Sequence, residues 1–176
     1  ILESLRDDAR NNRDLGDRFE RLTASFLRSD PLYADKFSDV WLFNDWPDKG
    51  RIGDTGIDIV AKERATGAYC AVQCKFYLPE HTIAKEDIDS FFTAAGKDPF
   101  ASCIIVSTTD KWSKNAEDAL GQTKPVVRIG LHDLRASPVD WSKFDPKRTS
   151  TLGVVAKKEV RPHQEAAIRD VLKGFK

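Results

Sequence analysis

The chain has 176 residues, of which 40% are hydrophobic and 32% are charged, so it is long enough for one full domain with a sizeable core and a smaller appendage. Its 28 Lys and Arg residues balance 28 Asp and Glu residues, which gives a formal net charge of zero. A free-standing protein that binds nucleic acid tightly is usually basic, so any such contact is expected to be local to a cleft or to depend on other domains.

The first part of the chain predicts one long helix followed by three strands. Apolar residues that recur at helical spacing indicate the helix, and Asp30-Pro31 ends it. Short apolar runs indicate the strands, and Gly67 supplies the turn between the second and the third. The predicted ranges are Asp7–Leu27 for the helix and Val40–Phe43, Ile57–Arg64 and Ala68–Tyr77 for the strands.

The second part of the chain alternates helices and strands. The predicted order is a helix, a strand, a helix with Ser113 as its N-cap, a strand and a short helix. A hairpin followed by crossover helices favours an α/β fold with a mixed central sheet flanked by helices on both faces. The predicted ranges are Ile83–Lys97, Ala101–Ser107, Ser113–Leu120, Pro125–Ile129 and Leu131–Arg135.

The C-terminal part of the chain changes character. Residues 138–150 are polar, contain two prolines and lack periodicity, which predicts a linker or a strap. Val160–Phe175 predicts a new amphipathic helix. We therefore expect three segments: a first domain over 1–137, a linker over 138–159, and the start of another domain over 160–176.

Three cysteines, Cys70, Cys74 and Cys103, lie in apolar strand settings. Their odd number and their surroundings predict free thiols in a reducing compartment. No apolar run approaches the length of a membrane span. We expect a cytoplasmic protein without membrane contact.

Polar side chains interrupt two otherwise apolar strands. Alternate residues of a strand share a face, so Gln73 and Lys75 project together, opposite the apolar face that includes Cys74. On the preceding strand, Asp58 points away from its apolar neighbours. Burying such groups costs several kcal/mol unless they are paired or hold a metal. These residues therefore predict a functional site.

The residue types suit the hydrolysis of a phosphodiester, which needs an activated water and compensation of charge on the phosphate oxygens. A hard divalent cation serves both needs, and Mg²⁺ prefers oxygen ligands. The expected ligands are Asp58, the amide of Gln73, the backbone carbonyl of Cys74 and a second carboxylate, Glu20. Lys75 is expected to orient or deprotonate the water and to offset charge in the transition state.

Glu20 lies one helical turn after Gly16, whose missing side chain is expected to let the helix approach the sheet closely. Alternatives remain for several of these residues. Asp58 is also compatible with an ion pair to Lys75, and Asp54 competes with it as the metal ligand. A charged residue at the border of a helix is often only solvated, which is the alternative for Glu20. The alternative for Gln73 is a hydrogen bond to neighbouring backbone only.

Three pieces of the sequence resemble the PD-(D/E)xK nuclease superfamily, and within it the Mrr-like restriction endonuclease branch. They are Gly16-Asp17-Arg18-Phe19-Glu20, Gly53-Asp54-Thr55-Gly56-Ile57-Asp58-Ile59 and Gln73-Cys74-Lys75. The likeness covers roughly residues 10–135. It implies a restriction-endonuclease-like core and Mg²⁺-dependent cleavage of double-stranded DNA that leaves a 5′-phosphate and a 3′-hydroxyl.

The same resemblance implies roles for the site residues. Asp58 and Glu20 would bind the metal, and Lys75 would be the catalytic lysine. Gln73 would be the variant third position, because the Mrr-like branch commonly carries Gln in place of the acid.

A second resemblance lies in Val160-Arg161-Pro162-His163-Gln164-Glu165-Ala166-Ala167-Ile168, which is similar to the opening helix of a superfamily-two helicase motor. The chain contains no GxxxxGK[ST] loop for ATP. A nuclease followed by a linker and a motor resembles the single-polypeptide type I (type ISP) restriction-modification enzymes. Those longer chains also carry methyltransferase and target-recognition domains, so ATP and S-adenosylmethionine are implied only for the full-length enzyme.

The sequence thus predicts a DNA endonuclease domain that cuts after translocation by an attached motor, with pairing of two nuclease domains as one route to a double-strand break. Two rivals remain. One is a non-catalytic coupling or DNA-binding module that keeps the nuclease fold. The other is a stand-alone Mrr-type, modification-dependent nuclease.

Overall fold

A central five-stranded sheet organises the molecule, for which a computed structural model describes residues 1–50, 56–121 and 124–155. The strand order is β1-β2-β3-β5-β7. β1 through β3 pair antiparallel, whereas β3, β5 and β7 run parallel, so the sheet is mixed as predicted. The strands are β1 (Phe37–Leu42), β2 (Ile59–Glu63), β3 (Tyr69–Lys75), β5 (Phe100–Ser107) and β7 (Val126–Ile129).

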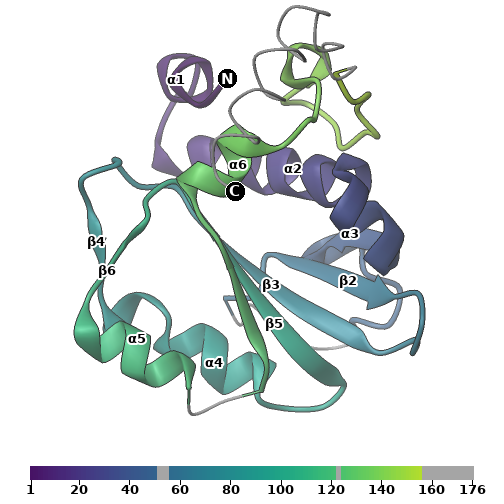
Figure 1. The fold of residues 1–176 in the computed structure, drawn as a ribbon, viewed down its shortest axis with the longest axis vertical. Coiled ribbons are helices and arrows are strands. Elements are labelled where there is room, and N and C mark those ends of the chain that lie inside the picture. The colour runs from purple at the N-terminus through teal and green to yellow at the C-terminus, as the bar shows by residue number, and fades with distance from the viewer. Residues whose placement is uncertain (51–55, 122–123, 156–176) are drawn as a thin grey trace, which may run out of the picture.

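Helices cover both faces of this sheet, which confirms the predicted α/β architecture (Figure 1). One face packs against α2 (Asn12–Ser29) and α6 (Leu131–Ala136), and the other against α4 (Asp89–Ala95) and α5 (Lys114–Leu120). The side chains of β3 divide between the two faces. Cys70 and Val72 pack on the α2 side and Ala71 packs on the α4 side, which confirms the predicted alternation.

The predicted helix Asp7–Leu27 corresponds to α2 but starts too early, because a separate helix ends at Asp7. α1 spans Leu2–Asp7 and α2 begins at Asn12. The side chain of Asn11 accepts a 2.9 Å hydrogen bond from the backbone N–H of Asp14 and so caps α2. Asp30-Pro31 ends α2 as expected but also starts α3 (Pro31–Lys36), with Asp30 as its N-cap.

The predicted helix Ile83–Lys97 is also wrong at its start. Strand β4 (Thr82–Ile83) pairs in parallel with β6 (Lys111–Trp112) in a second, two-stranded sheet. A 3-10 turn follows over Lys85–Asp87, and only then does α4 begin. The apolar residues that suggested a helix still face the core; they are Ile88, Phe91, Phe92 and Ala95.

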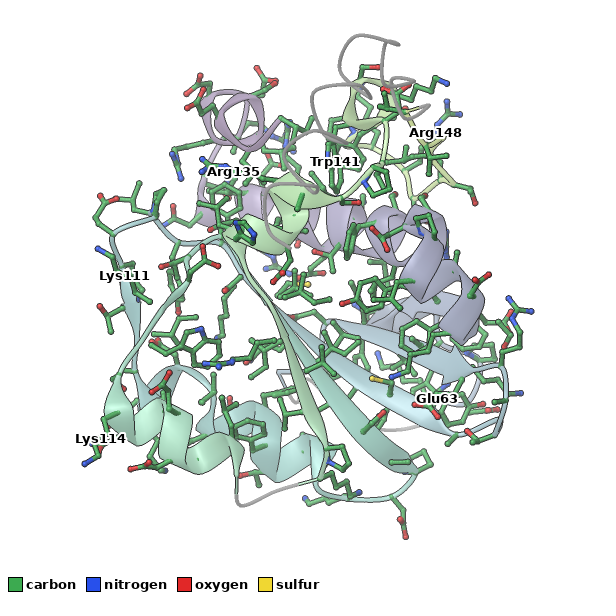
Figure 2. The ribbon with its side chains drawn as sticks, viewed as in Figure 1. Glu63, Lys111, Lys114, Arg135, Trp141 and Arg148 are labelled. Atoms are coloured by element: carbon green, nitrogen blue, oxygen red, sulfur yellow. The ribbon has the colours of Figure 1, made fainter. Side chains whose placement is uncertain are left out.

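Residues 138–155 form a strap over α2, so the strap alternative describes this part of the chain. The backbone N–H of Leu152 donates a 2.7 Å hydrogen bond to Ser29 Oγ, and that of Ser150 donates to Ser25 Oγ at 3.1 Å. Figure 2 shows Trp141 on this strap, and its ring stacks on Phe26 at 5.9 Å. The predicted helix Val160–Phe175 lies outside the described residues, and the proposed domain boundaries stay predictions.

The three cysteines are free thiols, as predicted. Cys70 and Cys103 are buried, and Cys74 is partly buried. None of the helices in the described ranges has the length and apolar character needed to cross a membrane.

Candidate functional site

Asp58 lies where β2 separates from β3. Its backbone N–H still donates to the Val72 carbonyl at 2.9 Å, but β2 itself begins only at Ile59. At Cys74, the next residue of β3 whose backbone points toward β2, the hydrogen-bond partner is the side chain of Asp58 rather than a backbone group. Its Oδ2 atom accepts a 2.6 Å hydrogen bond from the backbone N–H of Cys74. The carboxylate is therefore fixed in the opening between the two strands.

The backbone of Cys74 faces this same opening. The N–H and C=O of one strand residue point to the same side, so the Cys74 carbonyl points toward Asp58 and away from β5. The next residue has the opposite orientation, because the Lys75 carbonyl accepts a 3.1 Å hydrogen bond from Thr108 at the end of β5. The Cys74 carbonyl, which the sequence predicts as a ligand, therefore faces the same opening as Asp58.

Gln73 is buried, with 3% of its surface exposed, and only half of its amide is satisfied by the described residues. Nε2 donates a 3.2 Å hydrogen bond to the Gly56 carbonyl. Oε1 is buried and has no hydrogen-bond partner in the part of the chain that the structure describes. A buried acceptor left unpaired costs about 1–3 kcal/mol, so Oε1 is suited to a partner from outside the chain.

Lys75 lies on the same face of β3 as Gln73, and its positive charge acts on the carboxylate of Asp87. Desolvation acts to raise the pKa of Asp87, but hydrogen bonds from Ala84 N–H (2.8 Å) and the Tyr77 hydroxyl (3.0 Å), together with the charge of Lys75, lower it below its ordinary value. An acid therefore stands near the Lys75 ammonium on the side of α4.

Glu20 approaches the same place from α2. Phe19, its neighbour, packs edge-on against Phe76 at 5.2 Å, which fixes this turn of α2 beside the end of β3. Burial raises the pKa of the Cys74 thiol well above its ordinary value; the carboxylates of Asp58 and Glu20 raise it further, while the Lys75 ammonium opposes them. All three charged groups thus lie near enough to act on the Cys74 thiol, Glu20 from α2 and Lys75 from the opposite face of the sheet.

The expected role of Gly16 is wrong. A Cβ atom added at Gly16 would meet no atom of the described residues within 4 Å, so close approach of α2 to the sheet does not require glycine there. Gly16 borders open space on the same edge of α2 as Glu20, which lies four residues later.

The donor set fits a hard cation. Asp58 and Glu20 offer carboxylate oxygens, Gln73 offers the unpaired Oε1, and Cys74 offers its carbonyl, all ligands that Mg²⁺ accepts. Within residues 1–50, 56–121 and 124–155, no three Asp, Glu, His or Cys side chains are grouped so as to hold a metal. The candidate set instead combines acids with an amide and a carbonyl. The rival ligand Asp54 lies outside the described residues.

Sequence reasoning missed the scaffold beside Lys75. Thr108 Oγ1 accepts from the Tyr77 N–H at 2.7 Å and donates to the Tyr77 carbonyl at 2.6 Å, which extends the pairing of β3 with β5. Asp87 holds the Tyr77 hydroxyl from the other side. No motif indicated Asp87, because its 3-10 turn falls in the region where the sequence predicted a continuous helix.

Comparison with known proteins identifies related folds. A family model described as a restriction endonuclease (Mrr_cat_2) matches residues 28–151, a range that includes Asp58, Gln73 and Lys75 but not Glu20. Among solved structures, the chain is similar to the ATP-dependent type ISP restriction-modification enzyme LlaBIII bound to DNA, with 32% identity and a TM-score of 0.73. This match covers 99% of the chain and 11% of that enzyme.

The chain also matches the MspJI restriction endonuclease in complex with a 27-mer oligonucleotide, with 19% identity and a TM-score of 0.44. That match covers 76% of this chain and 29% of the other. A search of curated proteins found no match.

Proposed function

The chain belongs to the Mrr-like family of restriction endonucleases, and from this premise we propose that it is a Mg²⁺-dependent DNA-cleaving domain of an ATP-driven restriction-modification enzyme. The reaction is hydrolysis of a phosphodiester bond in double-stranded DNA. The active site consists of Asp58, Gln73, Cys74 and Lys75 at the end of β3, with Glu20 from α2.

The observation that carries the proposal is the buried amide of Gln73. Its Nε2 donates to the Gly56 carbonyl, and Oε1 is unpaired among the described residues. Gln73 lies two positions before Lys75 and directly before Cys74, whose backbone N–H donates to Asp58. A purely structural network would be expected to satisfy this acceptor. A metal held by Gln73 and Asp58 would give Oε1 the partner that it lacks among the described residues.

Asp58, Glu20, Gln73 Oε1 and the Cys74 carbonyl would hold the metal. A bound Mg²⁺ supplies charge to the phosphate oxygens and acidifies a water molecule. The chain contributes preorganisation, because the hydrogen bond from Cys74 N–H fixes Asp58 and the bond to Gly56 fixes Gln73. These contacts hold the ligands in place before DNA arrives.

Lys75 supplies a positive charge on a flexible side chain. Its Nζ orients the attacking water by a hydrogen bond and offsets the negative charge that develops on the phosphate in the transition state. Asp87 stands near Lys75 and is itself held by Ala84 and Tyr77. We propose that this acid limits the positions that the lysine adopts.

The larger assembly is proposed by analogy with the type ISP enzyme, of which the chain spans 11%. In this proposal a helicase motor uses ATP to move DNA to the nuclease, and methyltransferase and target-recognition domains use S-adenosylmethionine and read the site. One active site cuts one strand, so a double-strand break requires two nuclease domains or repeated nicking. We place the protein in the prokaryotic cytoplasm.

Cleavage of plasmid DNA by the intact protein, with ATP and Mg²⁺, tests the proposal. Asp58→Ala and Lys75→Ala are each expected to reduce cleavage by about 10²–10⁴-fold while the fold is retained. Lys62→Ala is the matched control, since Lys62 lies on β2 away from the site, and it should cut normally. Full cleavage by both site variants would refute the assignment.

A further inference from the structure

A groove of about 450 Å³ opens directly beyond Lys75, at the end of β3. The start of the chain forms one wall, with Arg6 from α1 and Asn12 and Leu15 from α2. The segment after β3 forms the other wall, with Phe76, Glu80 and His81. Because Phe76 follows Lys75 in sequence, anything bound in this groove lies next to the candidate active site.

Arg6 places a positive charge in the groove. Its guanidinium lies over the Phe76 ring, 5.2 Å from the ring centre, and this contact orients it. None of the carboxylates in the described ranges forms an ion pair with Arg6. An oriented guanidinium without an acidic partner suits a backbone phosphate, which it can bind through two parallel hydrogen bonds.

Hydrogen bonds hold the second wall of the groove, the segment after β3, in place. Thr108 makes two hydrogen bonds to the backbone of Tyr77. Thr109 Oγ1 donates to the His81 carbonyl at 2.7 Å and lies 3.1 Å from the Pro79 carbonyl. Both threonines are at most 2% exposed. The segment that carries His81 therefore keeps its place against α1 and α2.

Gly16 connects this groove with the candidate site. Asn12, Gly16 and Glu20 recur at intervals of four along one edge of α2, so they share a face. Glycine is a poor helix former, and no described atom crowds the position, so packing gives no reason for it. An opening for a ligand between Asn12 and Glu20 accounts for the missing side chain.

We propose that one DNA strand runs from the candidate site across Gly16 into this groove, where Arg6 binds a backbone phosphate next to the one that is cut. The sugars lie against the apolar wall formed by Leu15 and Phe76. The inference rests on the proposed function, because it assigns the path of the same substrate.

Binding of a short labelled DNA duplex by the chain tests the path, in the Asp58→Asn background and over a series of salt concentrations. Arg6→Ala is expected to weaken binding about tenfold and to lower the salt-dependence slope by about 0.9, the value for one phosphate contact. Arg148→Ala is the matched control, because Arg148 is exposed, paired with Asp145 and located on the strap (Figure 2). It should leave the slope unchanged.

The variant Arg6→Lys distinguishes an effect of the positive charge on DNA binding from an effect of packing against Phe76. Lysine keeps the phosphate contact and should restore the slope, whereas a purely structural role over Phe76 predicts equal losses from Arg6→Ala and Arg6→Lys with an unchanged slope. That outcome, or equal effects of Arg6→Ala and Arg148→Ala, overturns the proposal.

Gly16 gives an independent readout. Gly16→Ala should raise the melting temperature by about 2–4 °C, since alanine favours the helix. Gly16→Leu should retain the fold. It should weaken DNA binding at least about fivefold, because the added side chain would obstruct the proposed path and remove one or two close contacts with the strand. Asp17→Leu places the same side chain one position away and should not weaken binding. Equal binding by the wild type and Gly16→Leu contradicts the path.

These results are separable from those on cleavage. If Asp58 variants still cut DNA, the assignment of the active site fails, but the binding data still report on the groove. If binding is independent of Arg6 and Gly16, the groove proposal fails while the cleavage assignment stands.

Discussion

The carboxylate of Asp58 accepts a 2.6 Å hydrogen bond from the backbone N–H of Cys74, so a side chain continues the pairing that β2 has ended. The contact fixes Asp58 in the opening between β2 and β3. It also sets the direction of the Cys74 carbonyl, which faces the same opening. One hydrogen bond thereby organises two of the proposed metal ligands.

Replacing Gln73 by leucine should separate stability from metal binding. The variant loses the bond to Gly56 but no longer buries the unpaired Oε1, and these effects oppose each other. We expect the free energy of unfolding to change by less than about 1 kcal/mol, and Mn²⁺ affinity to fall at least about tenfold. Urea denaturation and a metal titration measure the two quantities. Unchanged Mn²⁺ affinity would exclude Gln73 from the ligand set.

Gln73→Glu tests the same position with the opposite effect. The carboxylate cannot donate to the Gly56 carbonyl, and its burial without a cation is unfavourable. We expect lower stability than the wild type without metal, and a larger rise in melting temperature when Mg²⁺ is added, because binding to the folded state is linked to stability. An equal rise in melting temperature for Gln73→Glu and the wild type when Mg²⁺ is added would contradict this prediction.

Gly56→Ala should damage both the fold and the site. Gly56 has φ +74°, and an added Cβ would lie 3.3 Å from Ser90 Oγ and 3.6 Å from Gln73 Nε2. The expected loss of stability is about 1–3 kcal/mol, with reduced cleavage because Gln73 is displaced. Gly67→Ala is the matched control, since Gly67 has φ +72° but only Lys62 Cε within 4 Å, at 3.9 Å. It should share the backbone strain but cut normally; equal cleavage by the two variants counts against a role for the Gln73 position.

Glu20→Gln should weaken metal binding less than a change at Asp58. Glu20 reaches the site from α2, where its carboxylate and that of Asp58 both act on Cys74. We expect Mn²⁺ affinity to fall about three- to tenfold, compared with no change for Asp17→Asn on the same helix. A titration that shows equal affinities for the two variants would assign Glu20 to the solvated surface.

Asp87→Asn should show a stability effect that depends on pH. The pKa of Asp87 is lowered in the folded state, so its contribution is present above the ordinary value of 3.8 and disappears as pH falls through the folded value. We expect a loss of about 1 kcal/mol at neutral pH that shrinks below pH 3.8. Urea denaturation across this range, with exposed Asp118→Asn as control, measures it. A loss that is constant with pH contradicts the prediction.

Most of the fold could be predicted from the periodicity of apolar residues in the sequence. The alternation in β3 and the continuous apolar run of β5 predicted two central strands and their faces, because both are set by burial. The short elements could not be predicted in this way. α1 and α2 are separated by a cap at Asn11, and β4 is two residues long, which is too short to show any pattern.

The candidate site followed in part for the same reason. Gln73 and Lys75 were recognised because they interrupt an apolar strand, and alternation placed them on one face. The hydrogen bond from Cys74 to Asp58 and the position of Asp87 depend on how segments distant in sequence meet, which no local pattern encodes. The close packing expected at Gly16 was wrong, because an added Cβ would meet no described atom within 4 Å.

Metal titration of the chain, followed by calorimetry, tests the central claim most directly. The account predicts one Mn²⁺ or Mg²⁺ site in the wild type, weakened at least about tenfold by Asp58→Asn. Asp133→Asn is the matched control, because Asp133 also accepts from a backbone N–H, that of Gly130 at 2.8 Å, and should bind metal as the wild type does. Absence of metal binding by the folded wild type, or identical affinities for the two variants, would contradict the account and favour a non-catalytic module.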